Sequence, residues 1–390
     1  MFDVIVCTHA RLEAALLREW VLWNHAAGVQ HFVIFDNNDV APGGMRDAFD
    51  EAVAPFPESL VTTHRFPRDV MNDPSLAEMY GLERAVFDSL DVSQENPLKQ
   101  RCYDMYRHRA RWIAFIDMDE VFVALQNITL PEFLAQPQIA DDASIGGVGV
   151  FWRVSHYSGH FLRPANGALT NYDLCEAHPS NKHIKTIVRG GLGEPAMRIH
   201  NAHYMTYAAG RRCITEPLLS PDGCGMYEHL FNESWSRPSS VHFQLNHYYA
   251  RSIEDFVTKV LRGSYFGNAL NSQHHQRHIG NGAYMSNCFR AKDEPTLRAA
   301  AKAAALRASL GIPWGPAHST VPPMDSGTRA WSPALGIFYD AIVSQKTWDE
   351  DFYLRANAGR ADCLPNPPLD GFGRFWLADT AEGACEYRFT

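Results

Sequence analysis

Short apolar runs alternate with helix-like segments at the start of the chain. Residues 2–8 form an apolar run with β-branched side chains, which predicts a strand. Residues 11–27 carry apolar side chains at helical spacing, and Gly28 ends the helix that this spacing predicts. Residues 31–39 form a second apolar strand that ends in acids and amides. The order strand, helix, strand predicts a parallel βαβ unit with a right-handed crossover.

The alternation continues through a strand that begins at Trp112 and breaks down after Pro137. Beyond that point, the predicted elements are separated by segments rich in Gly, Pro, Asn and His. We therefore expect an α/β protein with a mostly parallel, Rossmann-type sheet, flanking helices and an elaborated, loop-rich C-terminal half. The other predicted strands span 60–63, 144–152, 184–189, 197–205 and 241–245, and the other predicted helices span 45–54, 76–90, 97–109, 252–262, 293–310 and 333–344.

Composition indicates an ordinary soluble enzyme. The 390 residues are 46% hydrophobic and 20% charged, enough for a substantial core. The net charge of −9 argues against broad nucleic-acid binding, which needs a basic face. Eight cysteines without a C-x-x-C pair are few for a disulfide scaffold and wrongly spaced for structural zinc. Since no leader and no apolar stretch of about 18 residues is seen, we expect a reduced, cytoplasmic protein without a transmembrane segment.

Three carboxylates follow the apolar run at Trp112. Asp117, Asp119 and Glu120 lie within four positions. On an extended backbone, Asp117 and Asp119 point to the same side and Glu120 to the other. Such a strand end lies at the carboxyl edge of the sheet, where open α/β folds bind ligands. Paired acids repel each other unless a cation shares them, and Mg²⁺ or Mn²⁺ prefers such oxygen ligands. The stretch predicts a site for a metal ion and a diphosphate.

Polar residues also follow the first two strands. Thr8 and Arg11 come after the first strand, and Asp36 and Asn37 close the second. A carboxylate forms charge-assisted hydrogen bonds with hydroxyl or N–H groups, so these residues offer polar partners to a ligand at the same edge. Two alternatives stay open: Asn37 only forms a turn, and Arg11 is an ordinary surface residue.

Four blocks of sequence, taken in order, resemble one enzyme family. They are Arg11–Asn38 with Glu19-Trp20, Gln100–Phe122 with the acids, Lys185–Arg189 followed by His200, and Asn246–Gly263. In this arrangement the chain resembles glycosyltransferase family 92 and related bacterial family 2-like glycosyltransferases. It departs from the family pattern at Val121, where the family has Phe, and at His9-Ala10-Arg11, where the family has Lys-Asn-Glu.

The resemblance implies a GT-A-like fold and a hexosyltransferase with a DxD motif, Asp117-Met118-Asp119, that holds Mn²⁺ or Mg²⁺. The donor would be a UDP-sugar, with galactose as the first expectation, and the transfer would be inverting. Its nucleoside would be framed by Thr8, Arg11, Asp36 and Asn37. The acceptor would be a glycan or a glycolipid, the latter presented at a membrane face by peripheral contact. Residues 1–140 would bind the donor, 141–290 would complete the acceptor and metal site in the same domain, and 291–390 would form a helical and irregular extension.

The same resemblance suggests ligands from the later blocks. His247 would complete the metal shell, with His200 and His203 as competitors for that role. Lys185 and Arg189 are four positions apart on an extended segment, so both would face one side and offset phosphate charge. Ordinary surface charge is the alternative explanation for these two cations.

The catalytic base is the least constrained assignment. An inverting transfer needs a carboxylate or histidine that deprotonates the acceptor hydroxyl. Besides Asp119, Glu228 and Glu233 are the candidates in the loop-rich region, and spacing does not separate them from Glu216 and Asp222.

Two other functions fit parts of the pattern. Asp117 to Val121 also matches the strand-end motif of haloacid-dehalogenase-type phosphohydrolases, in which Asp117 would be a nucleophile and Asp119 an acid or base. More than a hundred residues precede the motif here, whereas that class places it on an early strand. The second alternative is an inactive sugar-binding protein on the same fold.

Overall fold

The computed structural model contains two compact units, each built from discontinuous segments. Unit 1 comprises Met1–Arg153, Pro179–His247 and Glu294–Pro316, and unit 2 comprises the rest of the chain. The division into 1–140, 141–290 and 291–390 that we expect from the sequence stays a prediction. The described residues are 1–38, 45–65, 95–155, 183–191, 211–215, 240–249 and 294–312, with shorter pieces within 160–172, 197–207 and 251–259; the predicted helices over 76–90 and 333–344 lie outside them.

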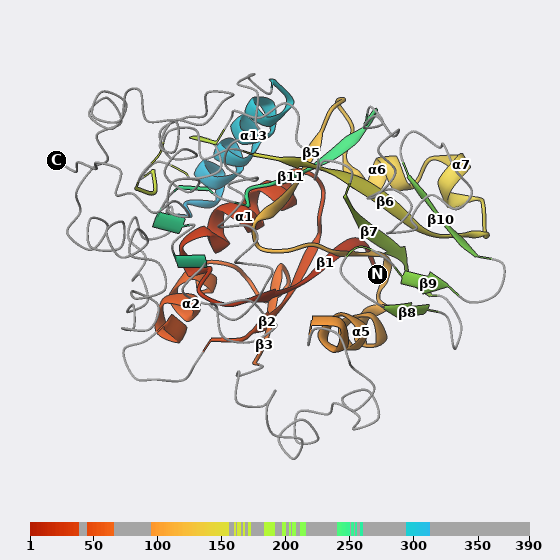
Figure 1. The fold of residues 1–390 in the computed structure, drawn as a ribbon, viewed down its shortest axis with the longest axis horizontal. Helices are drawn as coiled ribbons and strands as arrows, with labels where there is room; N and C mark the ends of the chain where they lie inside the picture. Colours follow the sequence, from red (N-terminus) through yellow and green to blue (C-terminus); the bar gives the residue numbers. More distant parts are fainter. Residues whose placement is uncertain are drawn as a thin grey trace, which may run out of the picture. The chain divides into compact units, whose positions relative to one another are not determined.

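The N-terminal half of unit 1 is a parallel sheet. β1 (Phe2–Ala10), β2 (His31–Asp36), β3 (Val61–Arg65) and β4 (Ala110–Phe115) lie in the order β3-β2-β1-β4, and each neighbouring pair is parallel (Figure 1). The predicted βαβ unit is confirmed. Because parallel strands end at the same edge, the residues that follow β1, β2 and β4 meet there.

Three helices accompany this parallel half: α1 (Ala14–Ala26), α2 (Met45–Val53) and α5 (Glu95–Tyr106). The end of α1 depends on Gly28, whose φ is +109°. A Cβ at this position would lie 2.6 Å from Pro131 Cδ, so both the backbone conformation and the close approach favour glycine. The predicted stop at Gly28 is confirmed.

Antiparallel pairing extends the sheet beyond β4. The added strands are β7 (Ile184–Arg189), β6 (Ile145–Val154), β11 (Phe243–His247) and β5 (Glu120–Ala124), in the order β4-β7-β6-β11-β5. β7 is antiparallel to β4 and β6, and β11 is antiparallel to β5. The α/β class and the Rossmann-type half are therefore confirmed, with an antiparallel extension that carries later residues back to the acids.

The remaining described elements are short. β10 (Arg212–Thr215) pairs in parallel with β6, and β8 (Met197–Ile199) pairs with β9 (Met205–Tyr207) in a separate ribbon. α6 (Leu130–Leu134) and α7 (Pro137–Ala140) were not anticipated from periodicity, because each is too short to show it. None of the helices that the structure describes has the length and apolar character needed to cross a membrane.

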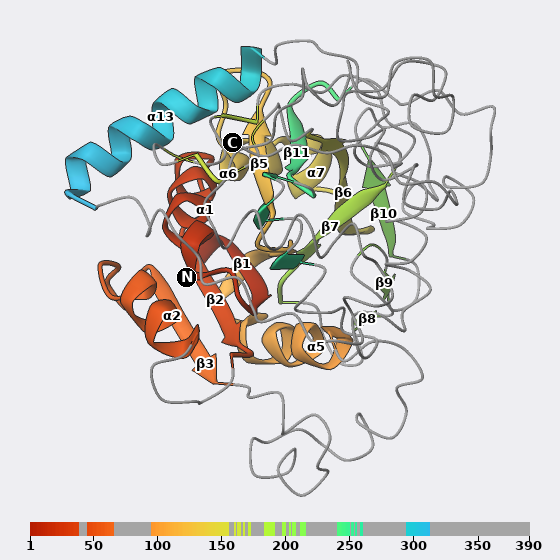
Figure 2. The same ribbon diagram turned by 60° about the vertical axis from the view of Figure 1, so that its left-hand side comes forward.

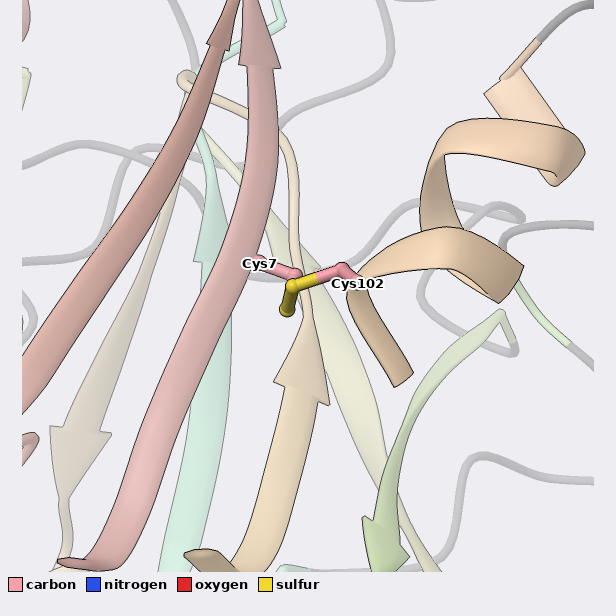
Figure 3. Close-up of a disulfide and its surroundings, with 2 residues drawn as sticks. All are labelled: Cys7 and Cys102. Carbon is pink, nitrogen blue, oxygen red and sulfur yellow. A yellow bond between two sulfur atoms is a disulfide. The ribbon is translucent and has the colours of Figure 1, made fainter. Parts of the chain in front are cut away.

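A disulfide joins β1 to α5. Cys7 on the strand is bonded to Cys102 on the helix, across a sequence separation of 95 residues and a Cα–Cα distance of 6.4 Å (Figure 3). This corrects the expectation that the cysteines are reduced. Spacing could not reveal the pair, because the two thiols meet only when α5 packs on the sheet.

The helix α13 (Glu294–Leu310) belongs to unit 1 although it lies far along the chain. It packs against α1 and β5, and Figures 1 and 2 both show it beside α1. Asn246 Nδ2 donates a buried hydrogen bond of 2.7 Å to Thr296 Oγ1, which ties the helix to β11. The start of the expected C-terminal extension is therefore an integral part of unit 1.

Unit 2 contains a buried ion pair. Arg163 pairs with Asp255, which also accepts a 2.9 Å hydrogen bond from Ser252 Oγ. Ser252 Oγ in turn accepts from Asp255 N at 3.1 Å, a contact typical of a helix N-cap, at the start of the helix predicted over 252–262. Burial alone would raise the pKa of Asp255, but the nearby Arg163 and Arg251 guanidinium groups lower it below its ordinary value.

Acid is expected to remove the stabilisation that Asp255 provides. Because its pKa in the folded protein is below the unfolded value of about 3.9, this contribution is present above that pH and is lost as the pH falls below it. The difference in unfolding free energy between wild type and Asp255→Asn should thus be larger near pH ~6 than near pH ~3. Urea titrations at both pH values measure it, and a constant difference would contradict the assignment.

Candidate active site

The three acids lie on a tight turn between two strands. β4 ends at Phe115 and β5 begins at Glu120, and Glu120 N donates to Asp117 O at 3.0 Å. The strand ends before the acids, and the expectation that the backbone stays extended through Asp117 and Asp119 is wrong. β4 and β5 occupy separate places in the sheet, so the chain must change direction here. The relative directions of the acids follow from the turn and not from strand alternation.

Two side chains of α1 fix this turn. Trp20 Nε1 donates to the carbonyl oxygens of Asp117 at 3.1 Å and Glu120 at 2.7 Å. Asn24 Oδ1 accepts from Phe122 N at 3.0 Å. The sequence pattern marks Trp20 only as an apolar helix position and gives Asn24 no role. Both residues are buried, so they hold the turn from the protein interior.

Lys185 of β7 reaches the turn and pairs with two of the acids. Its Nζ lies 2.6 Å from Asp117 Oδ2 and 3.5 Å from Glu120 Oε1, and its side chain is only 2% exposed. Glu120 Oε2 also accepts from Asp117 N at 2.9 Å. Glu120, which the sequence leaves without a role, therefore belongs to this cluster.

In this cluster the pKa of Asp117 and the pKa of Glu120 shift in opposite directions. Burial would raise the pKa of Asp117, but Lys185, followed by Lys99 and more weakly by His9, holds it well below its usual range. Burial raises the pKa of Glu120, Lys185 partly opposes the rise, and Asp117 adds to it. Asp117 is therefore the ionised member of the pair and Glu120 the more easily protonated one.

His247, the last residue of β11, lies beside the acid turn. The antiparallel register of β11 and β5 places His247 opposite Glu120. Its Nε2 lies 3.6 Å from Asp119 Oδ2, and both side chains are buried. The structure thus places His247, the predicted third metal ligand, beside Asp119.

Trp152 of β6 packs against this histidine and two others. Its ring centroid lies 4.2 Å from that of His247, 4.8 Å from that of His183 and 5.0 Å from that of His203. Burial lowers the pKa of His203, with further contributions from Lys185 and His183. His203 Nδ1 lies 2.8 Å from the carbonyl oxygen of Ile184, whereas His200 lies outside the described residues.

The donors at the turn match a hard divalent cation only in part. Among the residues that the structure describes, no three His, Cys, Asp or Glu side chains converge on one point. Asp117 Oδ1 is buried without a hydrogen-bond partner in that same part of the chain, and Asp119 and His247 are adjacent. Mg²⁺ commonly takes only one or two protein carboxylates and completes its shell with phosphate oxygens and water. The donor set fits that mode of binding.

The predicted nucleoside residues lie at the same edge. Ala10 of β1 is in register with Asp36 of β2. Asp36 Oδ1 accepts from Asn38 N at 3.0 Å and from Asn38 Nδ2 at 2.7 Å. Asn38 Oδ1 accepts from Leu12 N at 2.9 Å, and Leu12 has a φ of +58°. The acid and amide therefore shape the loop in which Arg11 lies.

Thr8 and Asn37 lie beside this loop. Thr8 is buried in β1, and its hydroxyl donates to the His9 carbonyl at 3.4 Å. Asn37 N donates to the Ala10 carbonyl at 2.9 Å, which continues the β1–β2 pairing past the strand end. This bond involves only the backbone of Asn37, so the nucleoside role and the turn role of its side chain both stay predictions.

Arg189 lies away from the cluster. Its guanidinium donates to the carbonyl oxygens of Ile139 at 2.6 Å and Ile145 at 2.8 Å and stacks over Trp112, 4.6 Å from the ring centroid. Because β7 is antiparallel to β4, it runs away from the acid edge after Lys185. The expectation that Lys185 and Arg189 share one site needs this correction: only Lys185 is at the turn.

Lys99 is a further residue that acts on the site. It is a buried residue of α5, and its charge lowers the pKa of Asp117. No local sequence pattern singles out Lys99, because Lys99 and Asp117 come near each other only when α5 and β4 are folded together.

The candidate bases Glu216, Asp222, Glu228 and Glu233 are all among the residues whose structure is not described.

Residues 3–190 match the family model described as Glycosyltransferase family 92, a span that includes the acid turn and Lys185. A glycosyltransferase family 92 protein of Oryza sativa subsp. japonica is 25% identical over 212 residues, which cover 54% of this chain and 31% of that protein. One of Ricinus communis is 22% identical over 228 residues, covering 55% and 33%. The chain thus spans about a third of the length of these relatives.

Among solved structures, a mannosyltransferase from Pyrobaculum calidifontis in complex with GDP-Man and Mn²⁺ is similar over 88% of this chain and 86% of that one. The sequence identity is 13% and the TM-score is 0.28. A likeness this weak adds no detail to the site.

Proposed function

This chain belongs to glycosyltransferase family 92 through residues 3–190, and on that premise we propose that it transfers a sugar from a UDP-sugar to a glycan or glycolipid acceptor. The observation that supports this most directly is the acid turn at the carboxyl edge of the parallel sheet. There, Asp117 and Asp119 lie beside Lys185 and His247. Ligands of open α/β sheets bind at this edge.

The residues of the turn would also hold a divalent cation. We propose that Asp117 Oδ1, Asp119 and His247 contribute donors to Mn²⁺ or Mg²⁺ and that the donor diphosphate and water complete the shell. When bound, the ion would neutralise charge on the departing UDP. A nucleoside would lie along the adjacent ends of β1 and β2, where Asp36 offers a carboxylate to hydroxyl or N–H groups.

Lys185 and Trp20 position the acids of this site. Lys185 keeps Asp117 ionised and fixes Asp117 Oδ2 by a 2.6 Å contact, which leaves Asp117 Oδ1 for another partner. Trp20 holds the backbone of the turn, so the carboxylates are positioned before a ligand arrives. We do not include Arg189 in the donor site, because carbonyl oxygens occupy its guanidinium.

Inverting transfer requires a base near the attacking hydroxyl, and Glu228 and Glu233 stay the candidates from the sequence. Galactose is the first donor sugar to test, since the family resemblance favours it. A glycolipid acceptor would bring the protein into peripheral contact with a membrane.

A donor screen with metal control tests this proposal. Purified protein is incubated with UDP-galactose, UDP-glucose, UDP-N-acetylglucosamine and GDP-mannose, with Mn²⁺ or with EDTA, and nucleoside diphosphate release is measured. We expect release from a UDP-sugar that depends on Mn²⁺ or Mg²⁺. NMR of the transferred product determines the anomeric configuration, and retention would contradict the inverting mechanism.

The same screen separates the alternatives. Release of inorganic phosphate from phosphomonoesters, without nucleoside diphosphate release, would favour a phosphohydrolase with Asp117 as nucleophile. Saturable donor binding without turnover, even with a range of glycan acceptors, would favour an inactive sugar-binding protein. Absence of donor binding with either cation would contradict the transferase proposal.

A further inference from the structure

A cavity of about 360 Å³ lies in unit 1 between α1, α13 and the segment that follows β5. Trp23 and Ala26 of α1 and Phe122 of β5 provide apolar lining, and residues 125–129 also line the cavity. Arg298 and Lys302 of α13 complete it. None of these lining residues belongs to the acid cluster or to the predicted nucleoside site.

Small side chains explain why this space is not filled. Ala26 at the end of α1, Ala27 directly after it and Ala299 on α13 line the cavity. Elsewhere along α13, Ala300 and Ala303 are buried, so the helices approach closely there. Next to that contact, the short side chains leave a volume within the usual range of small-ligand sites, about 300–1,000 Å³.

The charge of the lining is one-sided. Arg298 and Lys302 are one helical turn apart, and none of the lining residues that the structure describes is acidic, although the chain has a net charge of −9. Arg298 Nη2 donates to the Leu125 carbonyl at 3.3 Å, which holds the guanidinium at the rim. Glu294 lies one turn before Arg298 on α13 but is not part of the lining.

We propose that this cavity binds an anionic amphiphile, a molecule with one negatively charged head group and one apolar chain. The apolar chain would pack against Trp23, Ala26 and Phe122, where burial of apolar surface provides the affinity. The head group would lie between Arg298 and Lys302, whose two cations complement its charge. The combination of an apolar interior with a cationic rim excludes a preference for cationic or fully polar ligands.

Octanoate and 1-octanol provide a matched pair of probes, because they share the same chain and differ in the charge of the head group. Isothermal titration calorimetry with wild-type protein is expected to show one octanoate site and clearly weaker binding of 1-octanol. The double variant Arg298→Gln/Lys302→Gln should weaken octanoate binding by on the order of tenfold and leave 1-octanol binding unchanged. Both positions are exposed, so the fold should tolerate these changes.

Two more variants locate the site. Ala299→Phe places a large side chain in the lining and should abolish binding of both probes. Arg307→Gln removes the same charge from the same helix outside the lining and should leave octanoate binding unchanged. Equal binding of the two probes, no binding of octanoate to wild type, or equal weakening by Arg307→Gln would each overturn the proposal.

Vesicles distinguish the natural source of such a ligand. Phosphatidylcholine vesicles with and without phosphatidylglycerol are sedimented with the protein, and octanoate is added as competitor. Pocket-dependent binding to the anionic vesicles that octanoate displaces identifies a membrane lipid as the source. Octanoate binding without vesicle binding identifies a free amphiphile. Both measurements are independent of sugar transfer, so they can fail without affecting the proposed enzymatic function.

Discussion

Replacing Asp119 by asparagine is expected to lower kcat/KM for sugar transfer by about 10²–10³-fold, which corresponds to ~3–4 kcal/mol of transition-state stabilisation. Asparagine keeps the size of the side chain but removes the negative charge that faces His247 at 3.6 Å. The proposed cation would then lose one of its carboxylate donors. Initial rates of nucleoside diphosphate release at saturating Mn²⁺ measure the effect, and calorimetric titration with Mn²⁺ measures the accompanying loss of metal affinity.

The matched control for this variant is Asp141→Asn. Asp141 is an exposed carboxylate at the end of α7 and takes no part in the acid turn. Its replacement removes the same charge and should leave both rate and metal affinity unchanged. Equal donor hydrolysis by wild type and Asp119→Asn would contradict the assignment of Asp119 as a metal ligand. Thermal unfolding of each variant shows whether the fold is retained.

Replacing Lys185 by methionine should lower the unfolding free energy by about 3 kcal/mol, and it should also impair transfer. Methionine fills a similar volume but leaves Asp117 and Glu120 without the cation that now pairs with them. Removing one partner of a buried ion pair typically costs about 3–5 kcal/mol. The lower end applies because the side chain of Asp117 is 31% exposed and water can solvate it. Urea denaturation at neutral pH measures the change.

A double-mutant cycle separates this ion pair from simple loss of packing. In Lys185→Met/Asp117→Asn both charges are absent, so the double variant should regain part of the stability lost in Lys185→Met. Lys302→Met is the control for a lysine at an exposed position, and its unfolding free energy should stay within ~0.5 kcal/mol of wild type. Strictly additive losses in the cycle would show that Lys185 and Asp117 are not coupled.

Much of the parallel half was predictable because its elements are local. Apolar runs at residues 2–8 and 31–39 and the helical spacing between them indicate strands and a helix, and the order strand, helix, strand then predicts that the strands are parallel. The structure shows this arrangement, with Gly28 at the end of α1 as expected. Local propensity and long-range topology agree here, so periodicity was sufficient.

The acid site was predictable in composition but not in geometry. Asp117 and Asp119 stood out because three carboxylates follow an apolar strand. Their directions depend on the end of β4 at Phe115, and periodicity does not locate such boundaries. Lys185 and Arg189 illustrate the same limit: spacing puts them on one side of a strand, but the direction of β7 puts only Lys185 at the turn.

The α/β alternation, the acids at the end of a strand and the resemblance to one family can all be read along the chain, since they depend on neighbouring residues and their order. The distant groups that meet those acids are known only from the folded protein. Lys185 reaches Asp117 through the antiparallel β7, and His247 reaches Asp119 through the register of β11 with β5. The Cys7–Cys102 disulfide likewise requires α5 to pack on β1. Such contacts arise from strand direction, register and packing, which a linear pattern does not encode.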